Sequence, residues 1–514
     1  MTPIPAPPEL SADLRPSKAS TDGIERISTG IEGLDDILLG GLPAGYLYLL
    51  EGDPGTGKTT LALQFLLQGI RNGEKTLFVT LSESPEELVH TLRSHGWPTD
   101  SLLISEIAPP DEDLKPEAQY TVFHPSEVEL ADTIAAIVNQ VNAVNPSRVI
   151  FDSLSELRML ARDPLKYRRQ ILGLKRHLSG RHCTAILIDD YTAERGNDLQ
   201  LQSIAHGVIE MQSISRDYGV NRNRLQIRKL RGSPFRGGFH DYIIRTGGLH
   251  VFPRLIASEH KPGFTHTLVC SGLDQLDDLL GGGIDAGTST LLAGPAGSGK
   301  STIAFRYALS AAQRGEKAMV FTFDESIETL ITRVSKLGMD PSAQVESGRL
   351  EMQQIDPAEL APGEFVSRVR TLVDRDNLSL LVIDSINGLL NAMPHEQFLA
   401  MQLHELFSYL GQQGIATIIT LAHRGVIGAE MSSPIDVSYL ADTIILFRYY
   451  EQAGEIRQAL SVIKKRSGSH ERTIRELRFH HGAVHVGDPL VNFEGILTGV
   501  PHLLFPAASE GDLI

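Results

Sequence analysis

The sequence has very few cysteines and lacks long apolar runs. Cys183 and Cys270 are its only cysteines among 514 residues, which excludes a disulfide framework and a multi-cysteine metal site and agrees with a reducing compartment. No stretch approaches the roughly 18 apolar residues that a membrane helix needs, and the first residues contain prolines where an export signal would be apolar. We therefore expect a cytoplasmic protein without a membrane partner.

Positive charge is also scarce. The chain has 47 lysines and arginines against 63 aspartates and glutamates, a net charge of −16. Nucleic-acid phosphates attract surplus lysine and arginine, so we do not expect nonspecific nucleic-acid binding. The hydrophobic content of 41% is typical of folded proteins, and 514 residues exceed what one hydrophobic core usually organises. The composition thus predicts at least two folded domains.

One pattern occurs twice along the chain. The segment "EGDPGTGKTT" at 51–60 is echoed by "AGPAGSGKST" at 293–302, and the two lysines give a shift of 300 − 58 = 242. The segment "GEKTLFVTLSES" at 73–84 is echoed by "GEKAMVFTFDES" at 315–326, again with a shift of 242. Coincidence does not give one shift for two long segments, so the sequence indicates a duplicated domain.

Within each copy, short apolar runs rich in β-formers alternate with helical patterns. This alternation predicts an α/β fold in which a mostly parallel sheet is covered by crossover helices. In the first copy we expect strands at 46–50, 76–81 and 148–152 and a helix from Lys58; in the second we expect a strand at 380–384. The predicted organisation is a disordered leader at 1–23, a first domain at 24–253, a linker at 254–266, a second domain at 267–500 and a short tail at 501–514.

Both glycine-rich segments fit the P-loop pattern G-x-x-x-x-G-K-[ST] between an apolar strand and an amphipathic helix. The glycines let successive backbone N–H groups surround a β-phosphate, and the helix N-terminus favours the negative charge. Lys58 and Lys300 would neutralise β- and γ-phosphate charge. The predicted nucleotide contacts are Gly52, Gly55, Thr56, Gly57, Lys58, Thr59 and Thr60 in the first copy, and Gly294, Gly297, Ser298, Gly299, Lys300, Ser301 and Thr302 in the second.

A hydroxyl and a strand-end carboxylate accompany each lysine and predict a Mg²⁺ site. Thr59 would ligate the ion with Asp152, which closes the apolar run at 148–152. Ser301 would act with Asp384, which closes the run at 380–384. The chain has no Asn-Lys-x-Asp segment for reading guanine, so ATP is favoured over GTP. The alternative is that these are only glycine turns and strand-end aspartates.

The motifs "TLSES" and "TFDES" place Glu83 and Glu325 at equivalent positions, at the end of the strand expected beside the P-loop strand. Each could polarise a nucleophile near the γ-phosphate. Ser82 precedes the first glutamate and Asp324 the second. A doubled acid could hold a protein hydroxyl and accept its proton, whereas a single acid suffices to position water. The alternative is that all four residues cap the following helices.

A basic segment recurs late in each copy. The offset from Asp152 to Lys229 is 229 − 152 = 77, and the offset from Asp384 to Lys464 is 464 − 384 = 80. This near-constant offset favours a role at the γ-phosphate over nucleic-acid binding. With Arg231 and Arg466, these lysines could reach the nucleotide of a neighbouring subunit as arginine fingers do. The alternative is a pair of solvated basic strands.

Many segments together resemble the KaiC family of double-domain RecA-type ATPases of the circadian clock. The resemblance covers about residues 24–500 and is carried by "GLDDILLGGLPAG", "GDPGTGKTTLALQF", "FVTLSESP", "KLRG", "GSGKST", "FTFDES", "VIDS", "ADTIIL" and "KKRSGSHE". It implies two tandem RecA-like P-loop NTPase domains in a two-tiered homo-hexamer that binds ATP between subunits. The first tier would mainly hydrolyse ATP, and the second would be an autokinase and autophosphatase. The family's paired acids match Asp324 and Glu325, whereas Ser82 replaces one acid beside Glu83.

The resemblance also indicates phosphoacceptors and partners. The phosphorylated Ser-Thr pair of the family falls on Ser438 and Tyr439, counted back from "ADTIIL". The tyrosine hydroxyl stands farther from its Cα than a threonine hydroxyl, so Tyr439 is the weaker candidate. Only a short segment follows Pro501 in this sequence; a longer tail carries KaiA in the family, so we do not expect KaiA to bind. A KaiB-like partner on the first tier stays open.

The sequence thus predicts a Mg²⁺-dependent ATPase whose second domain phosphorylates its own Ser438. Three alternatives stay open at this point: an ATPase timer without phosphorylation, a signalling scaffold that binds ATP without turnover, and a recombinase-like DNA-dependent ATPase. Retention of both Glu83 and Glu325 speaks against the scaffold, and the acidic charge balance speaks against the DNA-dependent enzyme.

Overall fold

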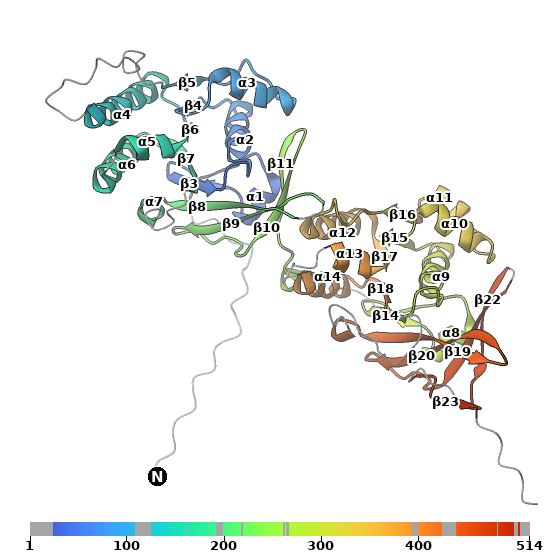
Figure 1. Ribbon diagram of the computed structural model, residues 1–514. Helices are drawn as coiled ribbons and strands as arrows, with labels where there is room; N and C mark the ends of the chain where they lie inside the picture. The colour runs from blue at the N-terminus through green and yellow to red at the C-terminus, as the bar shows by residue number, and fades with distance from the viewer. Residues whose placement is uncertain are drawn as a thin grey trace, which may run out of the picture. The chain divides into compact units, whose positions relative to one another are not determined.

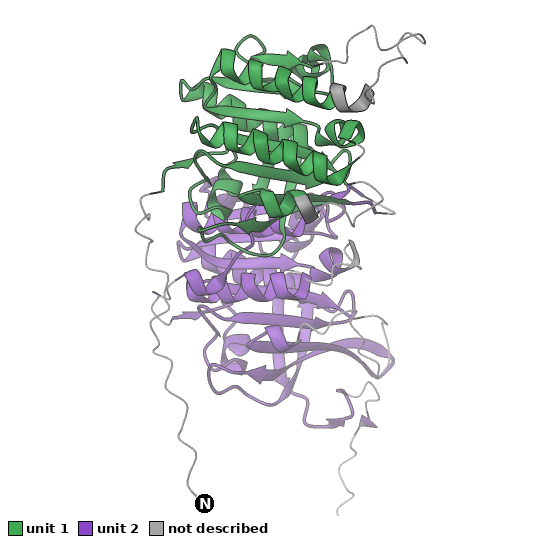
Figure 2. Ribbon diagram, turned by 90° about the vertical axis from the view of Figure 1, so that its left-hand side faces the viewer, with its two compact units in different colours: residues 1–213, 223–251 green, residues 214–222, 252–514 purple. Residues whose placement is uncertain are grey.

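The computed structural model describes residues 24–107, 125–161, 163–191, 199–216, 219–260, 263, 267–392, 399–423, 438–480, 482–497 and 502–503. The predicted leader and nearly all of the predicted tail lie outside these ranges. The chain divides into two compact units, one formed by residues 1–213 and 223–251 and the other by 214–222 and 252–514 (Figure 2). Among the helices that the structure describes, none combines the length and apolar character that a membrane crossing requires.

The first unit is built on a nine-stranded sheet in the order β11-β10-β9-β8-β3-β7-β6-β4-β5 (Figure 1). The central strand β3 pairs in parallel with both β7 and β8, while β9 and β10 pair antiparallel at one side. The strands are β3 (Leu47–Gly52), β4 (Thr76–Thr80), β5 (Ile104–Glu106), β6 (Arg148–Asp152), β7 (Thr184–Asp190), β8 (Gly207–Ile214), β9 (Arg222–Leu230), β10 (His240–Arg245) and β11 (Gly248–Phe252).

Helices cover both faces of this sheet, which explains why its central strands are apolar almost throughout. Strand β6 shows the alternation: Ile150 packs in the cluster that contains helix α2, whereas Val149 and Phe151 pack in the cluster that contains α4, α5 and α6. The helices are α1 (Glu32–Ile37), α2 (Lys58–Arg71), α3 (Pro85–Ser94), α4 (Pro125–Val144), α5 (Leu154–Ala161), α6 (Pro164–Ser179) and α7 (Leu199–Ile204), and β1 (Arg26–Ile27) pairs with β2 (Leu42–Pro43).

The second unit repeats this plan with a nine-stranded sheet in the order β16-β15-β17-β18-β14-β19-β20-β21-β22. Its central strand β14 pairs in parallel with β18 and β19, as β3 does with β7 and β8. The strands are β14 (Ser289–Gly294), β15 (Lys317–Thr322), β16 (Leu350–Gln354), β17 (Leu378–Asp384), β18 (Ala416–Ala422), β19 (Thr443–Gln452), β20 (Glu455–Lys465), β21 (Ile474–His480) and β22 (Ala483–Pro489).

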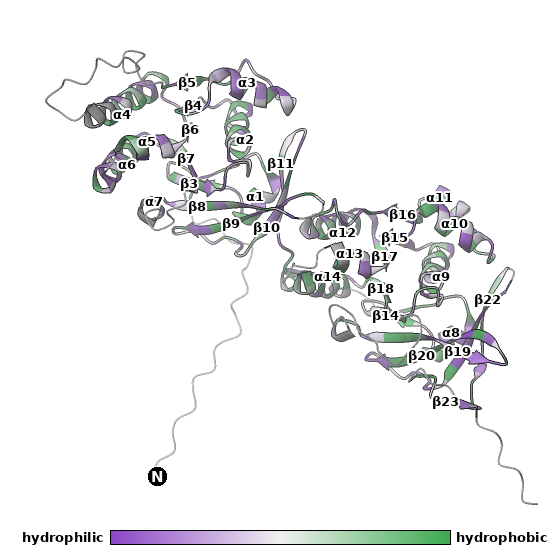
Figure 3. Ribbon diagram, in the orientation of Figure 1, coloured by the Kyte–Doolittle hydropathy of each residue, from purple (hydrophilic) through white to green (hydrophobic). Residues whose placement is uncertain are grey.

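The same two-sided packing recurs in the second sheet. Leu380 and Val382 of β17 pack in the cluster that contains α9, whereas Leu381 and Ile383 pack in the cluster that contains α12 and α14. Figure 3 shows hydrophobic residues along the central strands of each unit. The helices are α8 (Asp274–Leu279), α9 (Lys300–Gln313), α10 (Ile327–Ser335), α11 (Ser342–Glu346), α12 (Pro362–Asp376), α13 (Ile386–Ala392), α14 (Leu399–Gln412) and the 3-10 turns η2 (Ala257–Glu259) and η3 (Ser438–Leu440). The short pairs β12 (Leu268–Val269) with β13 (Ile284–Asp285) and β23 (Phe493–Glu494) with β24 (His502–Leu503) complete the second unit.

The predicted fold is confirmed: two tandem RecA-like α/β units with mostly parallel central sheets. The expected strands correspond to β3, β4, β6 and β17, and the helix expected from Lys58 begins at that residue. Each P-loop therefore follows the central strand of a sheet, at the carboxyl edge where the neighbouring parallel strands also end.

Candidate nucleotide-binding sites

Each P-loop connects a central strand to the helix that begins at its lysine. Gly57 and Gly299 are the N-caps of α2 and α9 and have φ of 89° and 100°, a left-handed conformation that favours glycine. A Cβ on Gly57 would lie 2.4 Å from Ile244 Cδ1, and a Cβ on Gly299 would lie 2.4 Å from Phe479 Cζ. Side chains of β10 and β21 thus lie directly against the P-loop of their own unit, and only glycine fits at positions 57 and 299.

The loops leave polar groups open for an anion. Gly55 and Gly297 also have positive φ, of 80° and 76°, and no atom of the described residues lies within 4 Å of a Cβ built on Gly55. Among the described residues the buried Ser298 hydroxyl has no hydrogen-bond partner, whereas Thr56 Oγ1 donates to Asp53 O at 2.8 Å. A glycine cradle at a helix N-terminus with an unsatisfied buried hydroxyl fits a phosphate group.

The predicted Mg²⁺ ligands meet in both units. Thr59 Oγ1 lies 3.1 Å from Asp152 Oδ2, and Ser301 Oγ lies 2.9 Å from Asp384 Oδ1. Burial, with Glu83 as the next cause, raises the pKa of Asp152 to about 7, and burial also raises the pKa of Asp384. A buried carboxylate beside a hydroxyl is a hard-oxygen pair whose charge a divalent cation would offset, so these residues fit Mg²⁺.

The two P-loop lysines have different partners. Lys58 Nζ donates to Gly52 O and Asp53 O and lies 2.6 Å from Asp190 Oδ1 at the end of β7. Lys300 Nζ donates to Pro295 O at 2.6 Å, and burial lowers its pKa to about 8. The register gives the reason, because β7 places Asp190 opposite Gly52 whereas β18 places Ala422 opposite Gly294.

The carboxylates after β4 and β15 are not helix caps. Ser84 caps α3 by accepting a hydrogen bond from Glu87 N, and Ser326 caps α10 by accepting one from Thr329 N. The alternative that Ser82, Glu83, Asp324 and Glu325 cap these helices is therefore wrong. Each capping serine directly follows its glutamate, so the glutamate side chain is not used to cap the helix.

The two glutamates sit in unlike surroundings. Burial, followed by Glu87 and Asp190, raises the pKa of Glu83, and no hydrogen bond or ion pair within the described ranges reaches its carboxylate. Glu325 instead accepts from Arg333 of α10, with Nη2 2.8 Å from Oε2. Asp324 Oδ2 accepts from Ser385 Oγ at 2.5 Å. The expectation that these residues end the strand beside the P-loop strand is wrong, because β6 and β7 lie between β4 and β3, and β17 and β18 lie between β15 and β14. Two carboxylates thus follow β15 in the second unit, and one follows β4 in the first.

The basic residues of the first unit contact the end of α7. Lys229 Nζ donates to the carbonyls of Gln202 and Ala205, and Arg231 Nη2 donates to Ser203 O at 2.7 Å. Cations favourably cap the exposed carbonyls at a helix C-terminus. Within the chain these side chains therefore bind the segment after β7, and a reach to another subunit's nucleotide stays a prediction.

The second unit has a similar arrangement around residues 438–442. Lys464 Nζ donates to Ala441 O at 2.6 Å, and Arg466 Nη1 lies 3.5 Å from Asp442 Oδ1. Ser438 opens the turn η3, and the Tyr439 side chain is 52% exposed. The predicted finger residues thus contact Ala441 and Asp442, which directly follow the turn that contains the predicted acceptors.

Sequence reasoning missed Asp190 and Arg333. The residue pair Asp189 and Asp190 closes an apolar run, the same signal that identified Asp152, so Asp190 could have been found as a strand-end carboxylate. Arg333 carries no motif, and Glu325 precedes the helix α10 on which Arg333 lies, so no sequence pattern identifies their contact. Both residues act on groups that the motifs did predict.

Comparison with known proteins agrees with this geometry. The family described as "ATPase: KaiC" matches residues 27–256 and 269–490. The chain is 29% identical over 494 residues to the circadian clock protein KaiC3 of Synechocystis sp. (strain ATCC 27184 / PCC 6803 / Kazusa), covering 95% of this chain and 97% of that protein. It is also 29% identical over 489 residues to the circadian clock oscillator protein KaiC of Picosynechococcus sp. (strain ATCC 27264 / PCC 7002 / PR-6), covering 93% of each.

Proposed function

The chain belongs to the KaiC family of ATPases, and from this premise we propose a division of labour between its two sites. The first unit hydrolyses ATP with water as the acceptor. The second unit transfers the γ-phosphoryl group to Ser438 and removes it again, as an autokinase and autophosphatase. Both reactions depend on Mg²⁺. Relatives named as circadian clock proteins suggest a clock or signalling role for this cycle.

The observation that carries the proposal is the unequal set of carboxylates beside otherwise matching P-loops. Both units have the lysine, the hydroxyl–aspartate pair and a glutamate after the corresponding strand, β4 or β15. Only the second unit adds a further acid, Asp324, beside its glutamate. One carboxylate suffices to orient water, whereas two can hold an alcohol and accept its proton.

Mg²⁺ would be held by Thr59 with Asp152 in the first unit and by Ser301 with Asp384 in the second. The ion would neutralise charge on the β- and γ-phosphates. Lys58 and Lys300 hold the same phosphates from the P-loop side. Asp324 and Glu325 take the proton of the attacking hydroxyl, and Glu83 takes that of water.

The contacts of the basic residues support a role in assembly. Lys464 donates to Ala441 O and Arg466 pairs with Asp442, a few residues after Ser438 in the chain. We propose that they serve the nucleotide of a neighbouring subunit in a two-tiered homo-hexamer, with Lys229 and Arg231 in the same role in the first tier. A basic side chain that arrives from a neighbour stabilises the charge of the transferring phosphoryl group.

Incubation of the full chain with Mg·ATP tests both halves of the proposal. Intact mass should show the gain of one phosphoryl group, and peptide mapping should place it on Ser438. Glu83→Gln should abolish most ADP release and leave phosphorylation, whereas the double variant Asp324→Asn/Glu325→Gln should do the reverse. Ser438→Ala is the matched control and should remove the mass gain without changing ADP release from the first site.

The outcomes separate this proposal from its alternatives. ADP release without any mass gain would leave an ATPase timer, for which Tyr439 in place of the family's threonine is the specific supporting feature. Binding of ATP without ADP release would indicate a scaffold. Stimulation of ADP release by single-stranded DNA would indicate a DNA-dependent enzyme.

A further inference from the structure

Arg333 joins three elements around the second candidate site. Its Nε lies 3.2 Å from Glu325 Oε1 and its Nη2 lies 2.8 Å from Oε2, so the guanidinium engages both oxygens of the carboxylate. Its Nη1 donates to Thr302 Oγ1 at 2.5 Å, in the first turn of α9 directly after the P-loop. A two-pronged guanidinium contact fixes the orientation of a carboxylate as well as its charge.

The first unit has every part of this arrangement except the arginine. The repeat shift of 242 places Thr60 at the position of Thr302, Glu83 at that of Glu325 and Thr91 at that of Arg333. Thr91 Oγ1 donates to Glu87 O within its own helix. The two sites therefore differ in whether the predicted base is tied to the P-loop helix.

We propose that Arg333 is a positioning residue that restrains Glu325 and thereby directs the second site away from water. The inference rests on the proposed function and gives the two acids different roles. Arg333 fixes the carboxylate of Glu325, and Asp324 accepts the proton of the attacking side-chain hydroxyl. The free Glu83 of the first unit has no such restraint and orients water.

The chemistry of the two reactions shows why this matters. In both, the bond between the γ-phosphorus and the bridging oxygen breaks, and ADP leaves with the bonding electrons. The attacking oxygen forms the new bond to phosphorus and gives its proton to a carboxylate. Attack by water yields inorganic phosphate and attack by serine yields phosphoserine, so the base that is free to act selects the product.

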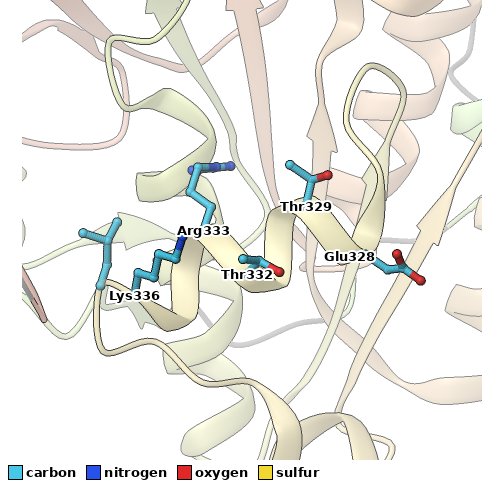
Figure 4. A pocket seen from close by; sticks show the side chains of 6 residues that line it. Glu328, Thr329, Thr332, Arg333 and Lys336 are labelled. Carbon is cyan, nitrogen blue, oxygen red and sulfur yellow. The ribbon is translucent and has the colours of Figure 1, made fainter.

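The surroundings of Arg333 allow the restraint to be reversible. Its side chain is 34% exposed and lines a pocket of about 550 Å³ on the surface of α10, together with Thr329, Thr332 and Lys336 (Figure 4). The guanidinium can therefore leave Glu325 without displacing a packed core. Replacing it should also leave the fold intact.

The test uses the full chain in a Glu83→Gln background, in which ADP release reports the second site. Arg333→Thr, which copies Thr91, should raise the kcat of ADP release about two- to fivefold, the scale expected for a pair exposed to this degree. The KM for ATP should stay unchanged, and less phosphate should be retained on the protein for each ADP released. Arg333→Lys keeps the charge but loses the two-pronged contact, so it should restore only part of the wild-type behaviour.

Two further variants complete the design. Arg370→Thr removes an exposed arginine that pairs with Asp374 on α12 and should change nothing. Thr91→Arg, in a Glu325→Gln background, rebuilds the arrangement in the first unit and should slow ADP release there. If circular dichroism shows that Arg333→Thr is unfolded, the Thr91→Arg variant alone tests the inference.

An unchanged or lower second-site kcat in a folded Arg333→Thr chain would overturn the inference, as would an unchanged first-site rate in Thr91→Arg. Either result would leave the proposed function standing if the unsubstituted chain still hydrolyses ATP. A chain with no ADP release and no mass gain would instead refute the proposed function.

Discussion

Lys58 Nζ lies 2.6 Å from Asp190 Oδ1, so the P-loop lysine of the first unit has an anionic partner within its own chain. The second unit has Ala422 at the matching register position, and Lys300 contacts a backbone carbonyl instead. A triphosphate needs the same ammonium that Asp190 engages. Nucleotide binding at the first site must therefore displace this pair, whereas none of the described acidic side chains forms an ion pair with Lys300.

Asp190→Asn should strengthen nucleotide binding at the first site. The amide keeps the shape of the side chain but removes the charge that competes for Lys58. We expect the Kd for Mg·ATP to fall roughly three- to tenfold, the scale of a charge-assisted contact at a partly exposed position. Calorimetric titration of a chain whose second site is blocked by Lys300→Ala measures this affinity directly.

Ala422→Asp provides the reciprocal experiment. It places a carboxylate opposite Gly294, where it can engage Lys300, and should weaken binding at the second site by a similar factor. Titration in a Lys58→Ala background isolates that site. Weaker binding in Asp190→Asn, or unchanged binding in both variants, would show that the aspartate does not compete with phosphate.

The lysines themselves should account for the binding stoichiometry. Lys58→Ala and Lys300→Ala should each reduce the nucleotide bound per chain from two to one, because each removes the phosphate-facing charge of one P-loop. Equilibrium dialysis with labelled ATP gives the count. Full occupancy in either variant would contradict the assignment of that P-loop.

The sequence predicted the parts of the sites that lie on continuous segments. The P-loops, the strand-end Asp152 and Asp384 and the order of strand and helix all follow from local patterns and from the repeat. Side-chain partners were less predictable because they depend on register. Asp190 lies far from Lys58 along the chain, and strand pairing alone brings it opposite Gly52.

The basic residues also show that side-chain partners are hard to predict from sequence. Their near-constant offset from Asp152 and Asp384 predicted a role at a phosphate, yet within the chain Lys229 and Lys464 donate to backbone carbonyls. An offset in sequence fixes the strand on which a residue lies. The direction of a long flexible side chain depends on neighbours that the pattern does not specify.

Gly57→Ala should destabilise the first unit through contact with β10. Its φ of 89° is unfavourable for alanine, and the new Cβ would lie 2.4 Å from Ile244 Cδ1. Backbone strain of this kind costs about 1–3 kcal/mol, so the denaturant midpoint should fall. The double variant Gly57→Ala/Ile244→Ala should recover part of the loss by removing the clashing methyl group.

Gly55→Ala separates the cost of the backbone conformation from the cost of the steric contact with β10. Its φ of 80° is similar, but within the part of the chain that the structure describes no atom lies within 4 Å of the new Cβ. It should therefore cost less free energy of unfolding than Gly57→Ala, and Ile244→Ala should not rescue it. Equal losses in the two alanine variants would mean that packing against β10 contributes nothing.

Two carboxyl groups of the first site have raised pKa values. Burial, then the negative charges of Glu87 and Asp190, raises the pKa of Glu83. Burial, then Glu83, raises the pKa of Asp152 to about 7, and Asp190 contributes there as well. Both groups work as anions, Glu83 to accept a proton and Asp152 to hold the cation, so protonation of either one should stop turnover.

The first-site kcat/KM should therefore fall as the pH decreases through about 7, well above the range in which ordinary carboxylates protonate. Asp190→Asn removes a negative charge that raises both pKa values, so the acid limb of its profile should move to lower pH. The measurement is kcat/KM for ADP release, which reports the groups of the free enzyme, in a Glu325→Gln background, from pH about 5 to 9. Glu87→Gln removes a charge that acts on Glu83 and should shift the limb in the same direction. A limb that moves to higher pH in Asp190→Asn would refute this assignment, because removing a neighbouring anion makes a carboxyl group easier to ionise.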